Sequence, residues 1–289
     1  PYFHVISPNK DYTFTPAIFD SNIYMLQNEY RQETKNSTLV TDFALTKGYK
    51  SKLYKKKNSI SHLFARYYLD LNYEKFNKSD LDIKIEKVTN DTYLKLFDSN
   101  LIKSLIKPSD KNKMTSVISL KLDHENYDFN IALKAYEELS GKNSDRYQFV
   151  IPSYDFSKNL YSNPEIGTIE FSSSGNNNLI NTNNLKSRIY NNLNLNSNNK
   201  YFKNGIQNNF SFYVKNINTV AKNDTVYKSS PQSELVSIFE TETSLPLIKY
   251  GNRTNEFLTP RISFRINPSD MKKNSGSRKI NTSNLFSIN

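Results

Sequence analysis

The chain has no cysteine and no tryptophan, and only 7 glycines and 3 histidines among its 289 residues. Without cysteine it has no thiol nucleophile, no cysteine-ligated zinc and no internal disulfide. His4, His62 and His124 lie far apart and show no metal-binding spacing, and the few glycines form no phosphate-binding loop. These absences leave little for catalysis, so we expect no enzyme activity, no cofactor and no metal site.

The chain also lacks long apolar runs. Its mean hydropathy is −0.69, and no stretch approaches the roughly 18 apolar residues of a transmembrane helix. It begins with Pro1 rather than methionine, and no signal peptide precedes the first motif. We therefore expect an internal piece of a longer protein without membrane-spanning helices.

What the chain does contain is aromatic and basic. It has 20 Tyr and 18 Phe, and 39 Lys and Arg against 28 Asp and Glu, which gives a net charge of +11. Hydrophobic residues make up 36%, below the roughly 45–50% of an ordinary globular domain. The aromatic content is nevertheless too high for a disordered chain. The composition predicts a folded protein with a thin conventional core.

Apolar and polar residues alternate along most of the chain, and this pattern predicts β-strands rather than helices. In residues 12–18, for example, every second residue is apolar or proline, and polar residues fill the positions between them. The pattern predicts roughly 13 strands. They fall at residues 12–18, 24–31, 39–46, 62–71, 81–86, 118–123, 127–134, 147–156, 168–172, 185–195, 209–216, 234–241 and 258–266.

Two architectures bury one face of such strands. A soluble sandwich packs apolar faces between two sheets and uses strands of about 5–6 residues. A transmembrane barrel turns its apolar face to lipid and its polar face to the lumen, with strands of about 9–11 residues. Several expected strands are long and charged on their second face, and connections before residue 145 alternate between longer and shorter, although the first connection, at residues 20–22, is short. We therefore predict an all-β fold, an antiparallel transmembrane β-barrel, with the sandwich as the alternative.

Two compositional features have a simpler explanation than a binding site. The basic stretch at residues 47–57 interleaves lysines with Tyr49 and Tyr54, which would suit nucleic acid or lipid phosphate. However, the chain holds roughly 40 asparagines, and a bias towards Asn and Lys explains this stretch as a solvated loop. Residues 175–184 and 191–204 are Asn-rich, and we expect hydrated loops and strand ends there rather than asparagine ladders. No nucleic-acid partner is expected.

Pro16 lies inside the first alternating segment. Proline cannot donate a hydrogen bond to a neighbouring strand, so it belongs at a sheet edge or a weak seam. A closed barrel has no free edge, but its first strand must pair with its last. Pro16 is therefore either a seam residue or a proline that merely ends a strand.

Residues 1–16 (PYFHVISPNKDYTFTP) resemble the entry into the barrel of the LPS-assembly outer-membrane protein, the LptD (OstA) family. Residues 29–31 (EYR) and 87–97 (KVTNDTYLKLF) resemble two later segments of that family. Residues 258–262 (LTPRI) and 284–286 (NLF) resemble two more near its end. The matches follow the family order and span nearly the whole chain, although His4 and the lack of tryptophan depart from the aromatic-rich pattern.

The resemblance implies that residues 1–289 form the N-terminal half of a larger barrel of about 26 strands. The family's periplasmic jellyroll and the C-terminal half of the barrel would then lie outside this chain. It also implies a location in the cell outer membrane and assembly of lipopolysaccharide (LPS) into the outer leaflet through a lateral gate. Pro1 and Pro16 match the family's gate prolines. The implied partners are LPS, the plug lipoprotein LptE and the periplasmic bridge protein LptA.

Thr13, Thr15, Glu29 and Arg31 alternate with apolar residues and are expected to face the lumen, where they would line a hydrophilic route or contact the plug. Two other functions remain open at this stage. One is a soluble or cell-surface β-rich binding module, such as an adhesin or carbohydrate binder. The other is a basic nucleic-acid binder, which would show steeply salt-dependent affinity.

Overall fold

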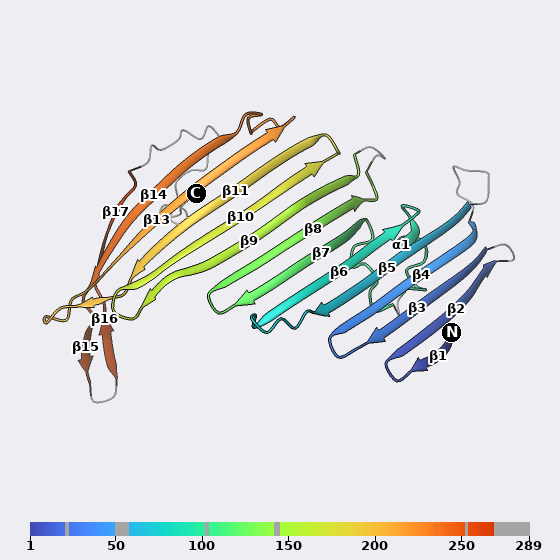
Figure 1. The fold of residues 1–289 in the computed structure, drawn as a ribbon, viewed down its shortest axis with the longest axis horizontal. Helices are drawn as coiled ribbons and strands as arrows, with labels where there is room; N and C mark the ends of the chain where they lie inside the picture. The colour runs from blue at the N-terminus through green and yellow to red at the C-terminus, as the bar shows by residue number, and fades with distance from the viewer. Residues whose placement is uncertain (21–22, 50–57, 102–103, 142–144, 252–253, 269–289) are drawn as a thin grey trace.

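The computed structural model describes residues 1–20, 23–49, 58–101, 104–141, 145–251 and 254–268. They form one large antiparallel sheet of 15 strands, in which almost every strand pairs with its neighbours in sequence (Figure 1). A separate hairpin and one short helix, α1 (Tyr93–Leu96), complete the described elements. The prediction of an all-β, antiparallel fold is confirmed.

The main path through the sheet runs β1-β2-β3-β4-β5-β6-β7-β8-β9-β10-β11-β13-β14-β17, with β12 paired to β13. The strands are β1 (Tyr2–Ser7), β2 (Lys10–Asp20), β3 (Ile23–Glu33), β4 (Ser37–Tyr49), β5 (Asn58–Asp70), β6 (Lys78–Val88), β7 (Lys113–His124), β8 (Tyr127–Glu138), β9 (Tyr147–Asn163), β10 (Gly167–Ile180), β11 (Asn184–Ser197), β12 (Lys200–Tyr201), β13 (Gln207–Lys222), β14 (Gln232–Ser244), β15 (Leu247–Tyr250), β16 (Asn255–Leu258) and β17 (Arg261–Ile266).

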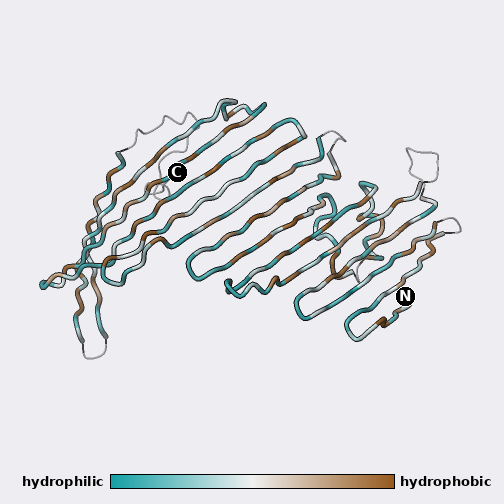
Figure 2. Tube along the Cα trace, in the orientation of Figure 1, coloured by the Kyte–Doolittle hydropathy of each residue, from teal (hydrophilic) through white to brown (hydrophobic). Residues whose placement is uncertain are grey.

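The strands are long. Apart from β12, those from β2 to β14 contain 11 to 17 residues, well beyond the mean of about 5–6 residues in soluble proteins. Apolar and polar residues alternate along them, as Figure 2 shows by colour. Because successive side chains of a strand point to opposite faces, the sheet has one apolar and one polar face.

The connections lie along two rims. The first rim carries the β2–β3, β4–β5, β6–β7 and β8–β9 connections, and the second carries β1–β2, β3–β4, β5–β6 and β7–β8. Residues 89–112 form the longest connection of the first rim, whereas the turns of the second rim at residues 8–9, 34–36 and 125–126 are tight. From β3 to β9 longer and shorter connections alternate as predicted, whereas the β2–β3 connection of the first rim is as short as the β1–β2 turn.

The sheet is not closed. β1 and β17 lie at opposite ends of it, and they do not pair within the part of the chain that the structure describes (Figure 1). The described helix is too short and too polar to cross a membrane. The described strands therefore form an open antiparallel sheet and not a closed barrel.

A buried apolar cluster forms where residues of the β6–β7 connection pack on one face of the sheet. Tyr93, Leu94, Phe97 and Leu101 of the connection are buried there. Their neighbours in the cluster are Met25, Ala44, Ile60, Phe64, Val88, Met114 and Leu139. The connection is thus a folded part of the molecule, and it covers the polar face of β3 to β6.

The structure corrects three sequence-based expectations. Residues 258–266 are not one strand, because Thr259 and Pro260 separate β16 from β17. Pro16 lies in the second strand, since β1 precedes it. The Asn-rich residues 175–184 and 191–204 are mostly strand, in β10 and β11, because asparagine side chains bond to each other across the strands. Residues 50–57 of the basic stretch and residues 284–286 lie outside the described residues.

Candidate functional site on the polar face and at the free edge

The polar face carries nearly all the charge of the main sheet. The polar face is the one that carries the side chains of Asp42 and His62. The opposite, apolar face carries those of their neighbours Phe43 and Leu63. When the first and last residue of each strand are left out, strand register assigns the following charged residues to the polar face: Asp11, Glu29, Arg31, Asp42, Arg66, Asp80, Asp82, Lys84, Glu86, Lys121, Asp123, Asp128, Lys134, Asp155, Glu170, Lys186, Arg188, Lys215, Glu234, Glu240, Glu242 and Arg265.

The apolar face carries charge only at its margins. Among side chains that the structure describes in the main sheet, its charged residues are Lys10, Lys47, Lys87, Glu137, Lys158, Lys200 and Lys222. All but Lys158 lie within three residues of a strand end, and Lys158 lies opposite Tyr127, the first residue of β8. Long basic side chains at the edge of an apolar band can extend their amines to water. The middle of this face is uncharged.

Tyrosines line the apolar face along the second rim. They are Tyr12, Tyr30, Tyr67, Tyr127 and Tyr161, each within four residues of a strand end at that rim. Tyrosine combines an apolar ring with a polar tip, and transmembrane barrels place such residues in girdles at the water–lipid boundary. The apolar face thus has an uncharged middle and a row of tyrosines along its second rim.

The four residues predicted to face the lumen lie together on the polar face. Thr13 of β2 pairs with Glu29 of β3, and Thr15 and Arg31 lie two residues away on the same side. Arg31 Nε donates a hydrogen bond of 2.8 Å to Asp11 and lies 3.6 Å from Glu29. The structure therefore brings these four residues onto the face that also carries the β6–β7 connection.

A buried polar network holds that connection on the sheet. The hydroxyl oxygen of Tyr93 lies 2.9 Å from His62 Nδ1, and His62 Nε2 lies 3.0 Å from an oxygen of Asp42. Gln27 Nε2 donates to both Asp42 oxygens at 3.0 and 3.1 Å. The His62 and Asp42 side chains are fully buried, so each polar atom depends on these partners. The imidazole of His62 satisfies both neighbours: its Nδ1 accepts a hydrogen bond from the Tyr93 hydroxyl, and its Nε2 donates one to Asp42.

An ion pair with Arg146 holds the connection at one further place. Arg146, before β9, bridges Asp91 of the connection at 2.9 Å and Glu137 of β8 at 2.5 Å. Lys87 Nζ approaches the other oxygen of Glu137 at 2.6 Å. Asp91 is exposed, but Glu137 is nearly buried, and a buried carboxylate is stable only when paired in this way.

Two titratable groups of the connection have altered acidity. Burial raises the pKa of the Tyr93 hydroxyl well above its usual range, so the phenol stays protonated and able to donate to His62. Hydrogen bonds from Lys107, and then from Lys111, lower the pKa of Asp98. The lowered pKa of Asp98 favours the folded form of the connection at neutral pH, where this carboxylate is ionised.

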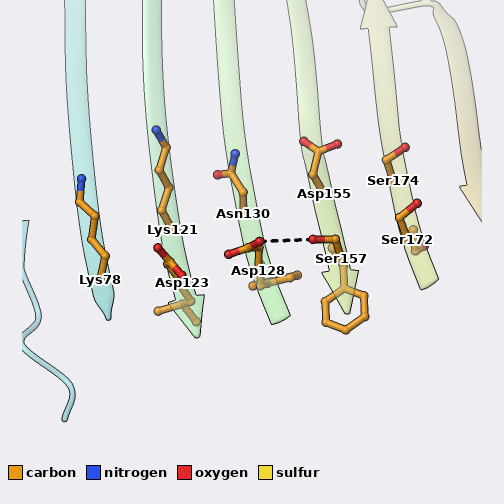
Figure 3. A pocket seen from close by; sticks show the side chains of 13 residues that line it. Lys78, Lys121, Asp123, Asp128, Asn130, Asp155, Ser157, Ser172 and Ser174 are labelled. Carbon is orange, nitrogen blue, oxygen red and sulfur yellow. Dashed lines mark hydrogen bonds between the residues drawn. The ribbon is translucent and has the colours of Figure 1, made fainter. Parts of the chain in front are cut away.

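A groove of about 440 Å³ crosses the polar face over β6 to β10 (Figure 3). Its volume falls within the usual range of small-molecule sites. The lining side chains on the polar face are those of Lys78, Lys121, Asp123, Asp128, Asn130, Asp155, Ser157, Ser172 and Ser174. Ser157 donates to Asp128 at 3.4 Å. The groove offers carboxylates, hydroxyls, an amide and amines, all of which can form hydrogen bonds.

Pro16 lies at the free edge of the sheet. It pairs with Leu26 of β3, but the pairing of β1 with β2 ends at Phe14. Glu33 N–H donates to the Asn9 carbonyl at 2.9 Å, so odd-numbered residues of β2 bond to β3 and even-numbered ones are directed the other way. The nitrogen of Pro16 therefore faces the edge beyond β1.

Pro1 immediately precedes β1, at the same end of the sheet as the Pro16 edge. Both predicted gate prolines are thus brought to one edge.

Sequence reasoning missed the network under the connection. His62 stood out only as one of three scattered histidines, and Asp42 and Gln27 as ordinary residues of the second face. The available signal was the resemblance of residues 87–97 to a family segment, which includes Tyr93. Neither the family models nor the curated proteins compared with this chain give a match.

Proposed function

We propose that this chain forms part of an outer-membrane β-barrel, the N-terminal half of an LptD-like translocon that assembles LPS into the outer leaflet. The transported lipid would follow the polar face and leave through a gate at the free edge of β1 and β2. LPS, the plug lipoprotein LptE and the bridge protein LptA would be its partners. Transport of this kind needs no covalent chemistry from the chain.

The observation that carries this proposal is the distribution of charge between the two faces. A soluble sheet with one solvated and one buried face would hide its apolar face against a second layer. Here the apolar face has no covering layer among the described elements, yet its middle is uncharged and its rim carries tyrosines. Lipid is the environment that such a surface fits.

The free edge supports the gate. A strand edge with unpaired backbone groups invites a partner strand, and the partner in a barrel would be the last strand. At Pro16 that seam would lack one hydrogen bond, so opening it would cost about 0.5–1.5 kcal/mol less than at a residue with an N–H.

A second candidate is a soluble or cell-surface binding module, such as an adhesin or carbohydrate binder. The groove on the polar face favours it, because carboxylates, hydroxyls and an amide suit sugar hydroxyls.

Fractionation of cells that express the full-length protein tests the choice. The proposal expects outer-membrane recovery, heat-modifiable gel mobility and loss of surface LPS on depletion. Recovery as a detergent-free soluble monomer would contradict it.

A further inference from the structure

The groove on the polar face is built from two rows of side chains that cross the strands. Register partners Lys121, Asn130, Asp155 and Ser174 make up one row. The other row consists of Lys78, Asp123, Asp128, Ser157 and Ser172. Figure 3 shows both rows on one side of the sheet, with the amines over β6 and β7 and the hydroxyls over β9 and β10.

The polar groups of the groove retain unused hydrogen-bonding capacity. Asp123, Asp155 and Lys121 form no side-chain hydrogen bond or ion pair with the described residues, whereas Lys78 is paired with Asp80 at 2.9 Å. The carboxamide oxygen of Asn130 is buried and accepts no hydrogen bond from the described residues. Elsewhere on the polar face, carboxylates such as Asp42 are fully bonded. The groove therefore has donors and acceptors to offer a ligand.

We propose that this groove binds an oligosaccharide that lies across the strands, with one anionic substituent beside Lys121. Adjacent strands are about 4.8 Å apart, so each row offers one polar group for roughly every pyranose unit of an extended glycan. Asp123, Asp128 and Asp155 accept hydrogen bonds from sugar hydroxyls, and the serines accept or donate. Lys121 binds a phosphate or carboxylate substituent through a charge-assisted hydrogen bond.

The charge of the groove limits the ligand. Three carboxylates lie beside one unpaired amine, so a chain with an acidic group on every sugar is repelled over most of its length. A bare divalent cation is also a poor fit, because the described residues contain no group of three metal-binding side chains arranged to hold one. A mainly neutral glycan with a local anionic group is the ligand that the rows complement.

The glycan would be the sugar part of the transported lipid, and in that respect the inference rests on the proposed function. Binding of a glycan in the groove, however, depends only on the arrangement of these side chains. The two statements can therefore fail separately.

Calorimetry on the full-length protein in detergent tests the groove. The probes are core oligosaccharide released from LPS by mild acid, and the same oligosaccharide after removal of its phosphates. We expect saturable binding of both, tighter for the phosphorylated form. D123N combined with D155N should weaken binding of both about tenfold, since each change removes a charged acceptor. K121Q should weaken only the phosphorylated form, to the level of the other.

D82N is the matched control, because Asp82 lies on the polar face of β6 but outside the groove. The D82N protein should bind both oligosaccharides as tightly as the unchanged protein does. Absence of saturable binding overturns the groove proposal, as does an equal loss in D82N or tighter binding of a basic peptide. If binding follows the expected pattern but the protein fractionates as soluble, the groove stands and the translocon proposal falls. If LPS export is intact but no glycan binds, the translocon proposal stands and the groove proposal falls.

Discussion

Pro16 of β2 pairs with Leu26 of β3, and its nitrogen is directed to the opposite side, where no described strand reaches it. The pairing of β1 stops at Phe14, two residues earlier. The chain therefore places a residue without an N–H on the side of β2 that would form a seam. This single relationship connects the sequence motif with the gate of the proposed translocon.

Replacing Pro16 with alanine should strengthen that seam. The new N–H adds one backbone hydrogen bond of about 0.5–1.5 kcal/mol, which corresponds to about two- to tenfold less open gate. We expect slower delivery of LPS to the surface, measured by pulse-labelling and surface accessibility, with more efficient cross-linking across the seam. Pro164→Ala is the control, because Pro164 lies in the turn between β9 and β10. Unchanged export and cross-linking in P16A would refute the seam role of Pro16.

Tyr93→Phe should loosen the β6–β7 connection. The change leaves His62 Nδ1 buried without its partner at 2.9 Å, which costs about 1–3 kcal/mol. Hydrogen–deuterium exchange within residues 89–101 should rise by one to two orders of magnitude, while exchange in β10 and β11 stays unchanged. Tyr73→Phe serves as the control, because Tyr73 is exposed. Equal exchange in Y93F and the unchanged protein would show that the network does not hold the connection.

The connection should also loosen in acid through Asp98. Lys107 and Lys111 hold the pKa of Asp98 below its usual value, so the folded state binds this proton more weakly than an unfolded chain does. The stabilisation is fully present above the unfolded pKa of about 3.9 and is lost as pH falls through the lowered folded pKa. Exchange in residues 104–111, corrected for its intrinsic pH dependence, should increase below about pH 4. In D98N the corrected exchange should be higher at neutral pH than in the unchanged protein and should not vary with pH. If exchange in D98N still increased below about pH 4, Asp98 would not be the source of the acid effect.

Gly167→Ala should prevent correct pairing of β10 with β11. Gly167 has a φ of 134°, and a Cβ there would lie 2.1 Å from the Asn196 carbonyl oxygen. The backbone strain alone costs about 1–3 kcal/mol, and the contact with backbone adds to it. Gly205→Ala is the matched control, with φ of 85° but a nearest atom at 3.6 Å. We expect G167A to fail in heat-modifiable assembly and G205A to assemble; equal assembly would contradict the described register.

Strand positions were predictable from sequence to a large degree. The twelve expected segments from 12–18 to 234–241 fall on observed strands, because alternation reports directly which face a side chain takes. β1 was missed, since Tyr2–Ser7 has apolar residues on both faces. Residues 175–184 and 191–204 were expected to be loops and strand ends, because asparagine favours turns in isolation. In β11 and β13, however, Asn191 donates to Asn216 at 3.2 Å, and such side-chain pairs support the ladder.

The candidate site was predictable only in part. Alternation placed Thr13, Thr15, Glu29 and Arg31 on one face, and the structure gives the same arrangement. The His62–Asp42 network could not be predicted, because it depends on where the β6–β7 connection folds back. Contacts of that kind are decided by packing between segments distant in sequence, about which periodicity carries no information.

The most direct test of a lipid-facing sheet is Ile118→Lys in β7. Ile118 is 46% exposed in the middle of the apolar face, so a solvated sheet would accept lysine with little change, whereas in a bilayer the charge costs about 2–4 kcal/mol. Ser119→Lys, on the polar face of the same strand, is the control. The measurement is the fraction of full-length protein recovered in the outer membrane in heat-modifiable form. Membrane exposure predicts a large loss for I118K and little for S119K; equal recovery of both would contradict it.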